Sequence, residues 1–169
     1  MDHAARDGDI RAASPTACAG RAALEGSEGA GGGQGRPLIY LDTSVALAHL
    51  FAEDRQPSED LWRHPLVSSR LLQYEIWVRL NARKLVSSHG GIAQELLSRL
   101  AFVELVPEVL RRALEPFPAS VRTLDAIHLA SADFVRQSKQ ALAIATYDQR
   151  LAAAARALGF PLHDLSGTG

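Results

Sequence analysis

Cysteine is almost absent from this sequence, which holds a single one, Cys18, among its 169 residues. One thiol cannot form a disulfide framework within the chain or a zinc site made of several cysteines, so both are excluded. No apolar run approaches the roughly 20 residues that cross a bilayer. The charged residues Asp7, Asp9 and Arg11 interrupt the N-terminus, where a signal peptide needs an apolar core. We therefore expect a cytoplasmic protein with no membrane-spanning segment.

A strong net charge is also missing, because the formal net charge is −1. No global basic field therefore indicates a nucleic-acid partner, although a local basic patch is sufficient to bind one. Residues 1–36 are rich in glycine and alanine and lack apolar periodicity. Such a segment cannot bury enough surface to offset the entropy of ordering it. The sequence thus predicts a disordered tail over 1–36 and a single domain over 37–165.

Short apolar runs alternate with helical patterns after the tail. Strands are expected over 38–41, 66–67, 102–106 and 141–145, with a further short strand over 160–163. Helices are expected over about 45–53, 61–62, 70–85, 107–115, 124–136 and 151–158, and another between Gly91 and about Leu100. Strands that alternate with helices are typical of an α/β sandwich with a mainly parallel central sheet.

Acidic residues follow two of the expected strands. Asp42 comes directly after the run 38–41, and Asp148 follows the run 141–145. In open parallel sheets the ligand crevice lies at the carboxyl ends of the strands, so both carboxylates are expected at one edge.

Helix capping is the simpler explanation for such acids. Asp42 helps to cap the next helix under this reading, and Thr43 or Ser44 can also cap it. Asp125 lies in the first turn of an apolar helix that Thr123 is expected to cap, and an acid there complements the helix dipole. These alternatives stay open on the sequence alone.

Glu75 lies early in the helix expected over 70–85, where an ion pair with Arg79 is the ordinary role. That pair is worth about 0.2–0.5 kcal/mol. Four carboxylates in one crevice repel one another unless a cation lies between them. Mg²⁺ binds oxygen ligands and keeps several waters, and Mn²⁺ suits the same ligands. Such an ion activates water and stabilises charge on a phosphate.

Four short motifs carry a family resemblance. They read Leu-Asp-Thr-Ser at 41–44, Tyr-Glu at 74–75, Leu-Asp-Ala-Ile-His-Leu-Ala at 124–130 and Thr-Tyr-Asp at 146–148. In this order they resemble the acidic motifs of PIN-domain ribonucleases, above all those of the VapC-type toxins of toxin–antitoxin pairs. The resemblance implies a three-layer α/β/α fold, metal-dependent cleavage of RNA with Mg²⁺ or Mn²⁺, a homodimer and a cognate antitoxin.

The same resemblance assigns the site residues. Asp42, Glu75, Asp125 and Asp148 form the acidic quartet, in which the three aspartates bind the metal. Supporting roles fall to three neighbours, Thr146, Ser44 and Arg122. Two alternatives stay open: a PIN-fold nuclease of RNA maturation that has no antitoxin, and a non-catalytic PIN-like interaction module.

Other polar and aromatic residues receive weaker interpretations. His128 is expected to be a packed histidine rather than a ligand, because Mg²⁺ favours oxygen over imidazole. Asp133 is left out because eight residues after Asp125 a side chain is rotated by about 80° around the helix. Two sets either contact RNA or serve as solvated or packed faces: the basic residues Arg79, Arg83 and Lys84, and the aromatic residues Trp62, Tyr74 and Trp77.

The tail supplies the first testable prediction. Deletion of residues 1–35 should leave the melting temperature and the activity nearly unchanged, because that segment has no apolar pattern able to build a core. Differential scanning calorimetry of the full and truncated chains measures this. A clear drop in melting temperature after truncation would show that the tail docks on the domain.

Overall fold

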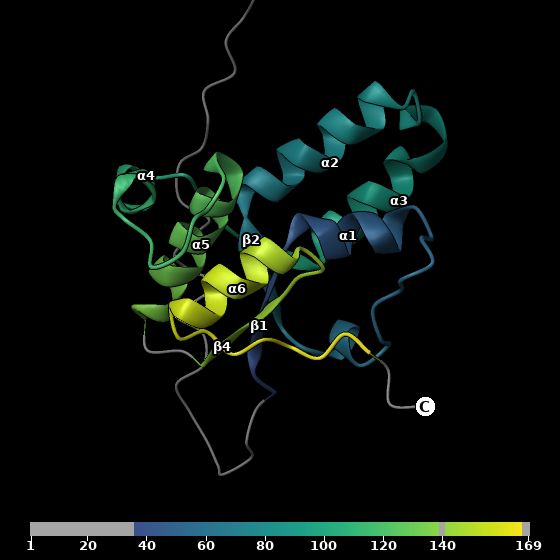
Figure 1. Cartoon of the computed structure of the whole chain (residues 1–169). Coiled ribbons are helices and arrows are strands. Elements are labelled where there is room, and N and C mark those ends of the chain that lie inside the picture. The colour runs from purple at the N-terminus through teal and green to yellow at the C-terminus, as the bar shows by residue number, and fades with distance from the viewer. Residues whose placement is uncertain (1–35, 139–140, 167–169) are drawn as a thin grey trace, which may run out of the picture.

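The structure is a computed structural model that describes residues 36–138 and 141–166. The predicted tail lies outside these ranges except for Arg36, so Cys18 also lies outside them. In chain order the elements are β1 (Leu38–Leu41), α1 (Thr43–Leu50), the 3₁₀ helix η1 (Leu61–Arg63), β2 (Leu66–Ser69), α2 (Arg70–Ala82), α3 (Val86–Ser98), β3 (Leu100–Val103), α4 (Pro107–Leu114), α5 (Thr123–Arg136), β4 (Leu142–Ala145) and α6 (Gln149–Ala157). Figure 1 shows their arrangement.

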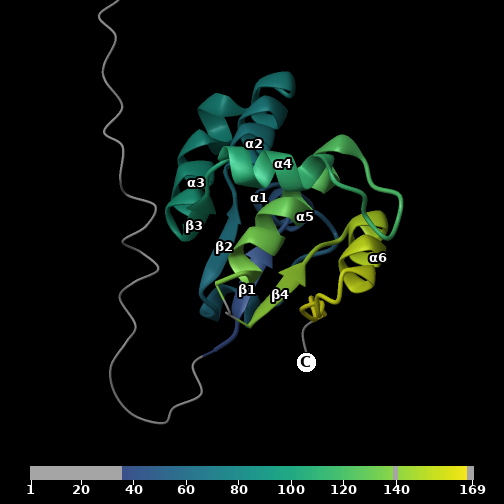
Figure 2. The same cartoon turned by 90° about the vertical axis from the view of Figure 1, so that its left-hand side faces the viewer.

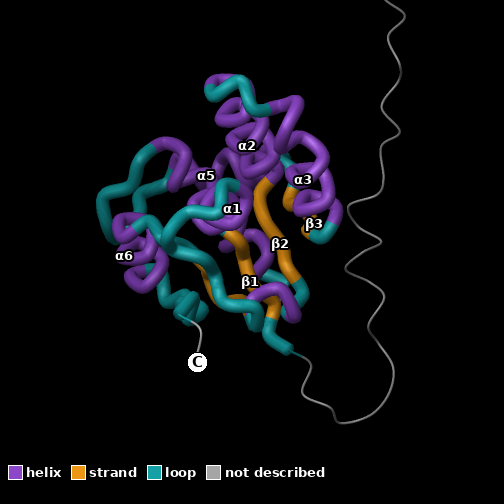
Figure 3. The backbone as a smooth tube through the Cα atoms, turned by 90° about the vertical axis from the view of Figure 1, so that its right-hand side faces the viewer, coloured by secondary structure: helices purple, strands orange, loops and turns teal. Residues whose placement is uncertain are grey.

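The four strands form one parallel sheet in the order β3-β2-β1-β4. Helices cover both faces of this sheet. Figure 2 shows α4 and α5 in front of the strands, and Figure 3, from the opposite side, shows α1 in front of β1. The predicted three-layer α/β/α architecture with a mainly parallel sheet is therefore confirmed.

Each face of the sheet has its own apolar core. Ile39 and Leu41 of β1 pack with the buried residues of α1, α2 and α3, whereas Tyr40 between them packs with those of α4, α5 and α6. Strands covered on both faces read as nearly continuous apolar runs, which explains why the runs of β1 and β4 do not alternate. Because β1 is buried from Ile39 to Leu41, the packing of both cores fixes the position of Asp42 directly after the strand.

Polar residues take over where three neighbouring strands end. Asp42 follows β1, Ser69 closes β2, and Thr146 follows β4. A helix begins almost at once after each of these strands, so the N-termini of α1, α2 and α6 meet at the same edge of the sheet.

Two helical boundaries differ from the sequence expectation. Gly90 and Gly91 lie inside α3 instead of separating two helices. Gly90 is buried on the side of α3 that faces Trp77 of α2, where a methyl group would lie 3.7 Å from the Trp77 ring. Helix α3 continues through both glycines despite the cost of about 0.5–1 kcal/mol that each adds to a helix interior. Helix α2 ends at Ala82 rather than near 85, because Lys84 takes a left-handed backbone conformation with φ 57°.

Two strands also differ. β3 spans Leu100–Val103 rather than 102–106, because these are the residues that pair with β2, from Leu66 with Leu100 to Ser69 with Val103. The segment 160–163 contributes a single parallel bridge, Ile144 with Leu162, and not a strand. Across residues 36–138 and 141–166, no helix is long and apolar enough to cross a membrane.

Candidate active site

Asp42 is the N-cap of α1, as the capping alternative for this residue predicts, and neither Thr43 nor Ser44 is the cap. The carboxyl is buried, and its Oδ2 atom accepts hydrogen bonds from the Ser44 backbone N–H (3.2 Å), the Ser44 hydroxyl (2.5 Å) and the Thr146 hydroxyl (2.8 Å). No hydrogen bond to its Oδ1 atom comes from the described part of the chain. One oxygen of Asp42 therefore caps the helix while the other remains available.

Thr146 connects the ends of β1 and β4. Its hydroxyl oxygen accepts a hydrogen bond from the Asp148 backbone N–H (3.0 Å) while the hydroxyl donates to Asp42. Asp148 in turn caps α6, because its Oδ1 atom accepts from the backbone N–H groups of Arg150 (2.7 Å) and Leu151 (3.1 Å). The Thr146 hydroxyl thus links the two aspartates that follow β1 and β4, and both lie at the same edge of the parallel sheet, as the sequence predicts.

Asp125 is the third residue of α5, and its Oδ2 atom accepts a hydrogen bond from the Arg122 backbone N–H (3.2 Å). Arg122 is the N-cap of this helix, so the prediction that Thr123 caps it was wrong. Among the residues with described positions, neither Oδ1 of Asp125 nor Oδ2 of Asp148 accepts a hydrogen bond. All three aspartates therefore combine a helix-terminal bond on one oxygen with a second oxygen free for another partner.

Glu75 and His128 form the best-connected polar pair of the site. The Glu75 Oε2 atom accepts hydrogen bonds from the Thr43 hydroxyl (2.5 Å) and from His128 Nε2 (2.9 Å). His128 Nδ1 lies 2.9 Å from the Tyr40 hydroxyl oxygen, which also accepts the Ser69 backbone N–H (3.1 Å). Within the described chain Glu75 makes no salt bridge with Arg79, so its partner is His128 instead.

Burial and charge set the protonation of this pair. Burial alone raises the pKa of Glu75, but the hydrogen bonds from His128 and Thr43 and the nearby positive charge outweigh it and hold that pKa below its usual value. Burial likewise lowers the pKa of His128, but the bond to Glu75 and the charges of Asp42, Glu75 and Asp125 outweigh it and leave the pKa raised. Burial, with the Asp42 charge, raises the pKa of Tyr40, so the phenol keeps its proton.

Carboxylate oxygens are the donors that Mg²⁺ and Mn²⁺ prefer, so the donor set suits a hard cation. Across the described residues, however, no three His, Cys, Asp or Glu side chains converge on a common point at metal-binding distances. His128 Nε2 lies 4.0 Å from Asp42 Oδ1 and 2.9 Å from Glu75 Oε2, and the raised pKa of His128 favours the positively charged imidazole beside these carboxylates. The residues thus fit a metal in their chemistry, and waters complete the coordination of Mg²⁺ where protein ligands are few.

Comparison with known proteins decides the family. A family model described as the PIN domain matches residues 39–157, which contain all four acidic motifs. The chain belongs to the PIN-domain family. Two curated relatives come from Mycobacterium tuberculosis. One, named ribonuclease VapC47, is 32% identical over 130 residues, which are 73% of this chain and 93% of that protein.

The second relative, named ribonuclease VapC46, is 35% identical over 127 residues, or 72% of this chain and 92% of that protein. A solved toxin–antitoxin complex from Klebsiella pneumoniae is a weaker match, with a TM-score of 0.48 and 18% identity over 68% of this chain and 90% of that chain. This likeness is too distant to bear on function. The PIN-domain assignment therefore rests on the family model and the two mycobacterial sequences.

His128 is the residue that sequence reasoning undervalued. It is buried, as expected, but it contacts Glu75 and lies one turn after Asp125 on α5. The signal was present, because a buried polar group needs a partner and the strand residue Tyr40 has a hydroxyl in an apolar run. Asp133, which was left out, pairs with Arg112 at 2.9 Å and with Arg136, away from this network.

The Tyr40 hydroxyl gives a stability prediction. Tyr40→Phe should lower the free energy of unfolding by about 1–3 kcal/mol, because the buried Ser69 N–H and His128 Nδ1 lose a partner. Denaturant unfolding of the chelator-treated protein measures this loss. Tyr74→Phe is the matched control, since Tyr74 is 61% exposed and should change stability little. Equal stability of the two variants would contradict the role given to the buried hydroxyl.

Proposed function

We propose that this PIN-domain protein is a metal-dependent endoribonuclease, the toxin of a toxin–antitoxin pair, which hydrolyses phosphodiester bonds in RNA. Its membership of the family and the names of its two mycobacterial relatives support the reaction class. One observation of the site carries the proposal further. Asp42, Asp125 and Asp148 each use one oxygen at a helix terminus and keep the other available at the same edge of the sheet.

In this proposal the three aspartates hold Mg²⁺ or Mn²⁺. The ion, when bound, activates a water as nucleophile and stabilises negative charge on the phosphate. Ser44 and Thr146 hold the Asp42 carboxylate in place through their hydroxyl groups. The metal-binding and supporting roles of these residues remain predictions.

Glu75 completes the site or orients the attacking water. Because an ionised carboxylate only accepts hydrogen bonds, His128 Nε2 carries the proton between them. The Tyr40 hydroxyl hydrogen-bonds the other ring nitrogen, Nδ1. His128 is therefore a positioning residue that sets the direction of the Glu75 carboxylate.

A cognate antitoxin is the expected protein partner. A segment of that partner laid across the acidic edge can place an arginine on the carboxylates in place of the metal, with charge-assisted hydrogen bonds. Two alternatives remain: a nuclease of RNA maturation without an antitoxin, and a non-catalytic module. A small neighbouring gene that encodes a DNA-binding protein would favour the toxin over the RNA-maturation nuclease. Cleavage of RNA by the purified protein would exclude the non-catalytic module. The cytoplasmic location stays a prediction.

Asp42→Asn tests the metal site. Asparagine caps a helix about as well as aspartate, and its oxygen can accept the bonds from Ser44 and Thr146, so folding should hold. A hard cation binds the neutral amide far more weakly, so RNA cleavage with Mg²⁺ or Mn²⁺ should fall by orders of magnitude. A chelator should abolish the wild-type activity, and an excess of metal should restore it.

A second readout separates ligand loss from misfolding. Mg²⁺ or Mn²⁺ should raise the melting temperature of the wild type by mass action and should leave that of Asp42→Asn unchanged. Asp60→Asn is the matched control, because Asp60 pairs with Arg36 beside the start of β1, at the other end of the sheet. Full cleavage by Asp42→Asn, or by the wild type in the presence of a chelator, would remove the metal from the mechanism.

The homodimer expected from the family also has a candidate surface. A groove of about 590 Å³ lies between α4 and the start of α5, and apolar side chains form most of its lining. Leu114 is 87% exposed there, and Leu110, one turn earlier on α4, is 42% exposed. Contiguous apolar surface of this kind is typical of protein contacts. We propose that a second copy of the chain covers it.

Leu114→Glu tests this interface. A buried glutamate at the contact should convert the dimer to a monomer, because an unpaired charge is costly to desolvate. Sedimentation at micromolar concentration measures the mass. Val78→Glu is the control, since Val78 is 67% exposed on α2. A monomeric wild type, or a dimer that survives Leu114→Glu, would count against this surface.

A further inference from the structure

A second hollow of the molecule adjoins the acidic site. It is a groove of about 320 Å³, and its lining includes Asp148 of the quartet and Ser44, whose hydroxyl donates to Asp42. The remaining lining residues are Leu47, Phe51, Glu53, Arg55, Arg79, Arg83 and Tyr147. We call this hollow the arginine groove. It continues the candidate active site outward between α1, α2 and the turn that follows β4.

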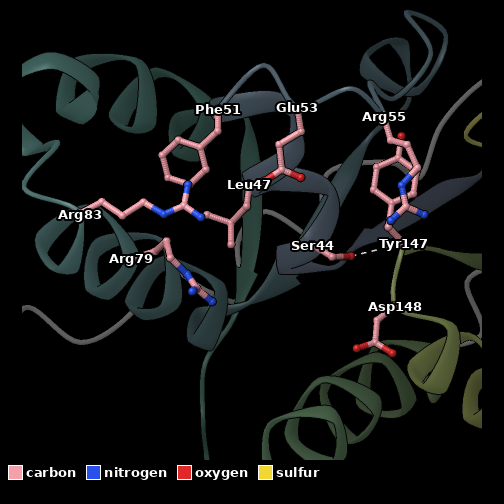
Figure 4. Close-up of a pocket in the computed structure, with 9 residues that line it drawn as sticks. All are labelled: Ser44, Leu47, Phe51, Glu53, Arg55, Arg79, Arg83, Tyr147 and Asp148. Atoms are coloured by element: carbon pink, nitrogen blue, oxygen red, sulfur yellow. Dashed lines mark hydrogen bonds between the residues drawn. The ribbon is translucent and has the colours of Figure 1, made fainter.

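Three guanidinium groups gather in the arginine groove from two separate elements. Arg79 and Arg83 lie one turn apart at the C-terminal end of α2, and Arg55 belongs to the loop after α1. Figure 4 shows Arg79 and Arg83 on one side, Arg55 above Tyr147 on the other, and Ser44 between them. Within the described chain none of these arginines forms a salt bridge, although Glu53 lines the same groove. The groove therefore presents positive charge with no internal partner.

Aromatic rings hold two of these guanidinium groups. Arg83 lies over the ring of Phe51 at 4.5 Å, and Arg55 lies over the ring of Tyr147 at 5.3 Å. Tyr147 is itself anchored beside the acids, because its backbone N–H donates to the Ser44 hydroxyl oxygen (2.9 Å). Such cation–π contacts orient a guanidinium while its N–H groups still face outward.

We propose that the arginine groove binds the segment of single-stranded RNA next to the bond that is cleaved, with phosphates on Arg79 and Arg83 and a base against the Arg55–Tyr147 pair. This inference rests on the proposed function. Arginine pairs with phosphate through parallel hydrogen bonds, and bases stack on aromatic rings and guanidinium planes. A basic segment of an antitoxin suits the acids but is repelled by these arginines, so RNA is the occupant that the charges favour.

Binding is tested apart from cleavage. A short, fluorescently labelled single-stranded RNA is titrated in chelator, and the dissociation constant is followed by anisotropy between about 50 and 200 mM salt. Arg79→Gln/Arg83→Gln should weaken binding by about tenfold or more and reduce the salt slope by about 1.4, which corresponds to two lost phosphate contacts on a single strand. The control pair Arg63→Gln/Arg156→Gln removes two exposed charges outside the groove lining and should stay near the wild type.

Tyr147 tests the stacking contact. Tyr147→Leu should weaken RNA binding by about 5- to 150-fold, which is the range of base stacking on an aromatic side chain, whereas Tyr147→Phe should retain it. The melting temperature is recorded for each variant. Should Tyr147→Leu fail to fold, the result for Arg79→Gln/Arg83→Gln decides the proposal. Arg79 and Arg83 are exposed, so their replacement spares the core.

The outcomes separate this inference from the proposed function. RNA affinity and salt slope of Arg79→Gln/Arg83→Gln equal to those of the control pair would overturn the groove assignment, even if the wild type cleaves RNA with Mg²⁺. If Arg79→Gln/Arg83→Gln keeps its RNA affinity but no longer binds a co-expressed protein, the groove is the binding site of that protein, and the RNA assignment is overturned. If the wild type binds RNA through the groove but cleaves none with Mg²⁺ or Mn²⁺, the proposed nuclease function is overturned and the proposal that the groove binds RNA still holds.

Discussion

The imidazole of His128 joins four elements of the fold at the edge where the carboxylates lie. It belongs to α5, which covers one face of the sheet, and it binds Tyr40 in β1 and Glu75 in α2. Its Nε2 atom also lies 3.3 Å from the Thr43 hydroxyl at the start of α1. Because α1 and α2 cover the opposite face, these hydrogen bonds pass around the end of the sheet. Asp125 lies one turn before His128, so its place relative to Glu75 depends on the same ring.

The sequence could predict the architecture because burial on both faces leaves a strong mark. The runs at β1 and β4 are apolar at every position, and the position of Asp42 and Asp148 after them follows from how parallel sheets end. It could not predict boundaries that packing decides. The two glycines of α3 resemble a break between helices, yet the helix continues through them, with Gly90 buried beside Trp77 of α2. The bounds of β3 follow from its pairing with β2, which begins at Leu100.

The candidate site was predictable in its residue types and less so in its connections. Asp42 was offered as a cap or a ligand, yet a carboxylate has two oxygens and the structure gives the cap only one of them. Glu75 was paired with Arg79 by sequence spacing, but the helix turns it toward His128, a partner 53 residues away. No local rule finds such a pair. The sequence offered Arg79 and Arg83 as possible RNA contacts, but it could not show that the loop residue Arg55 joins them in one groove beside the acidic edge.

The segment after α6 has a consequence for colloidal behaviour. β4 is the outer strand of the sheet, and its Ile144 N–H donates to the Pro161 carbonyl while the His163 N–H donates to the Ile144 carbonyl, both at 2.9 Å. Phe160, buried beneath Arg136, pins this cover in place. A bare outer strand is a template on which other chains add strands. Proteolysis between α6 and Phe160 would loosen this cover, and the exposed edges of β4 would then pair with strands of other molecules and form aggregates.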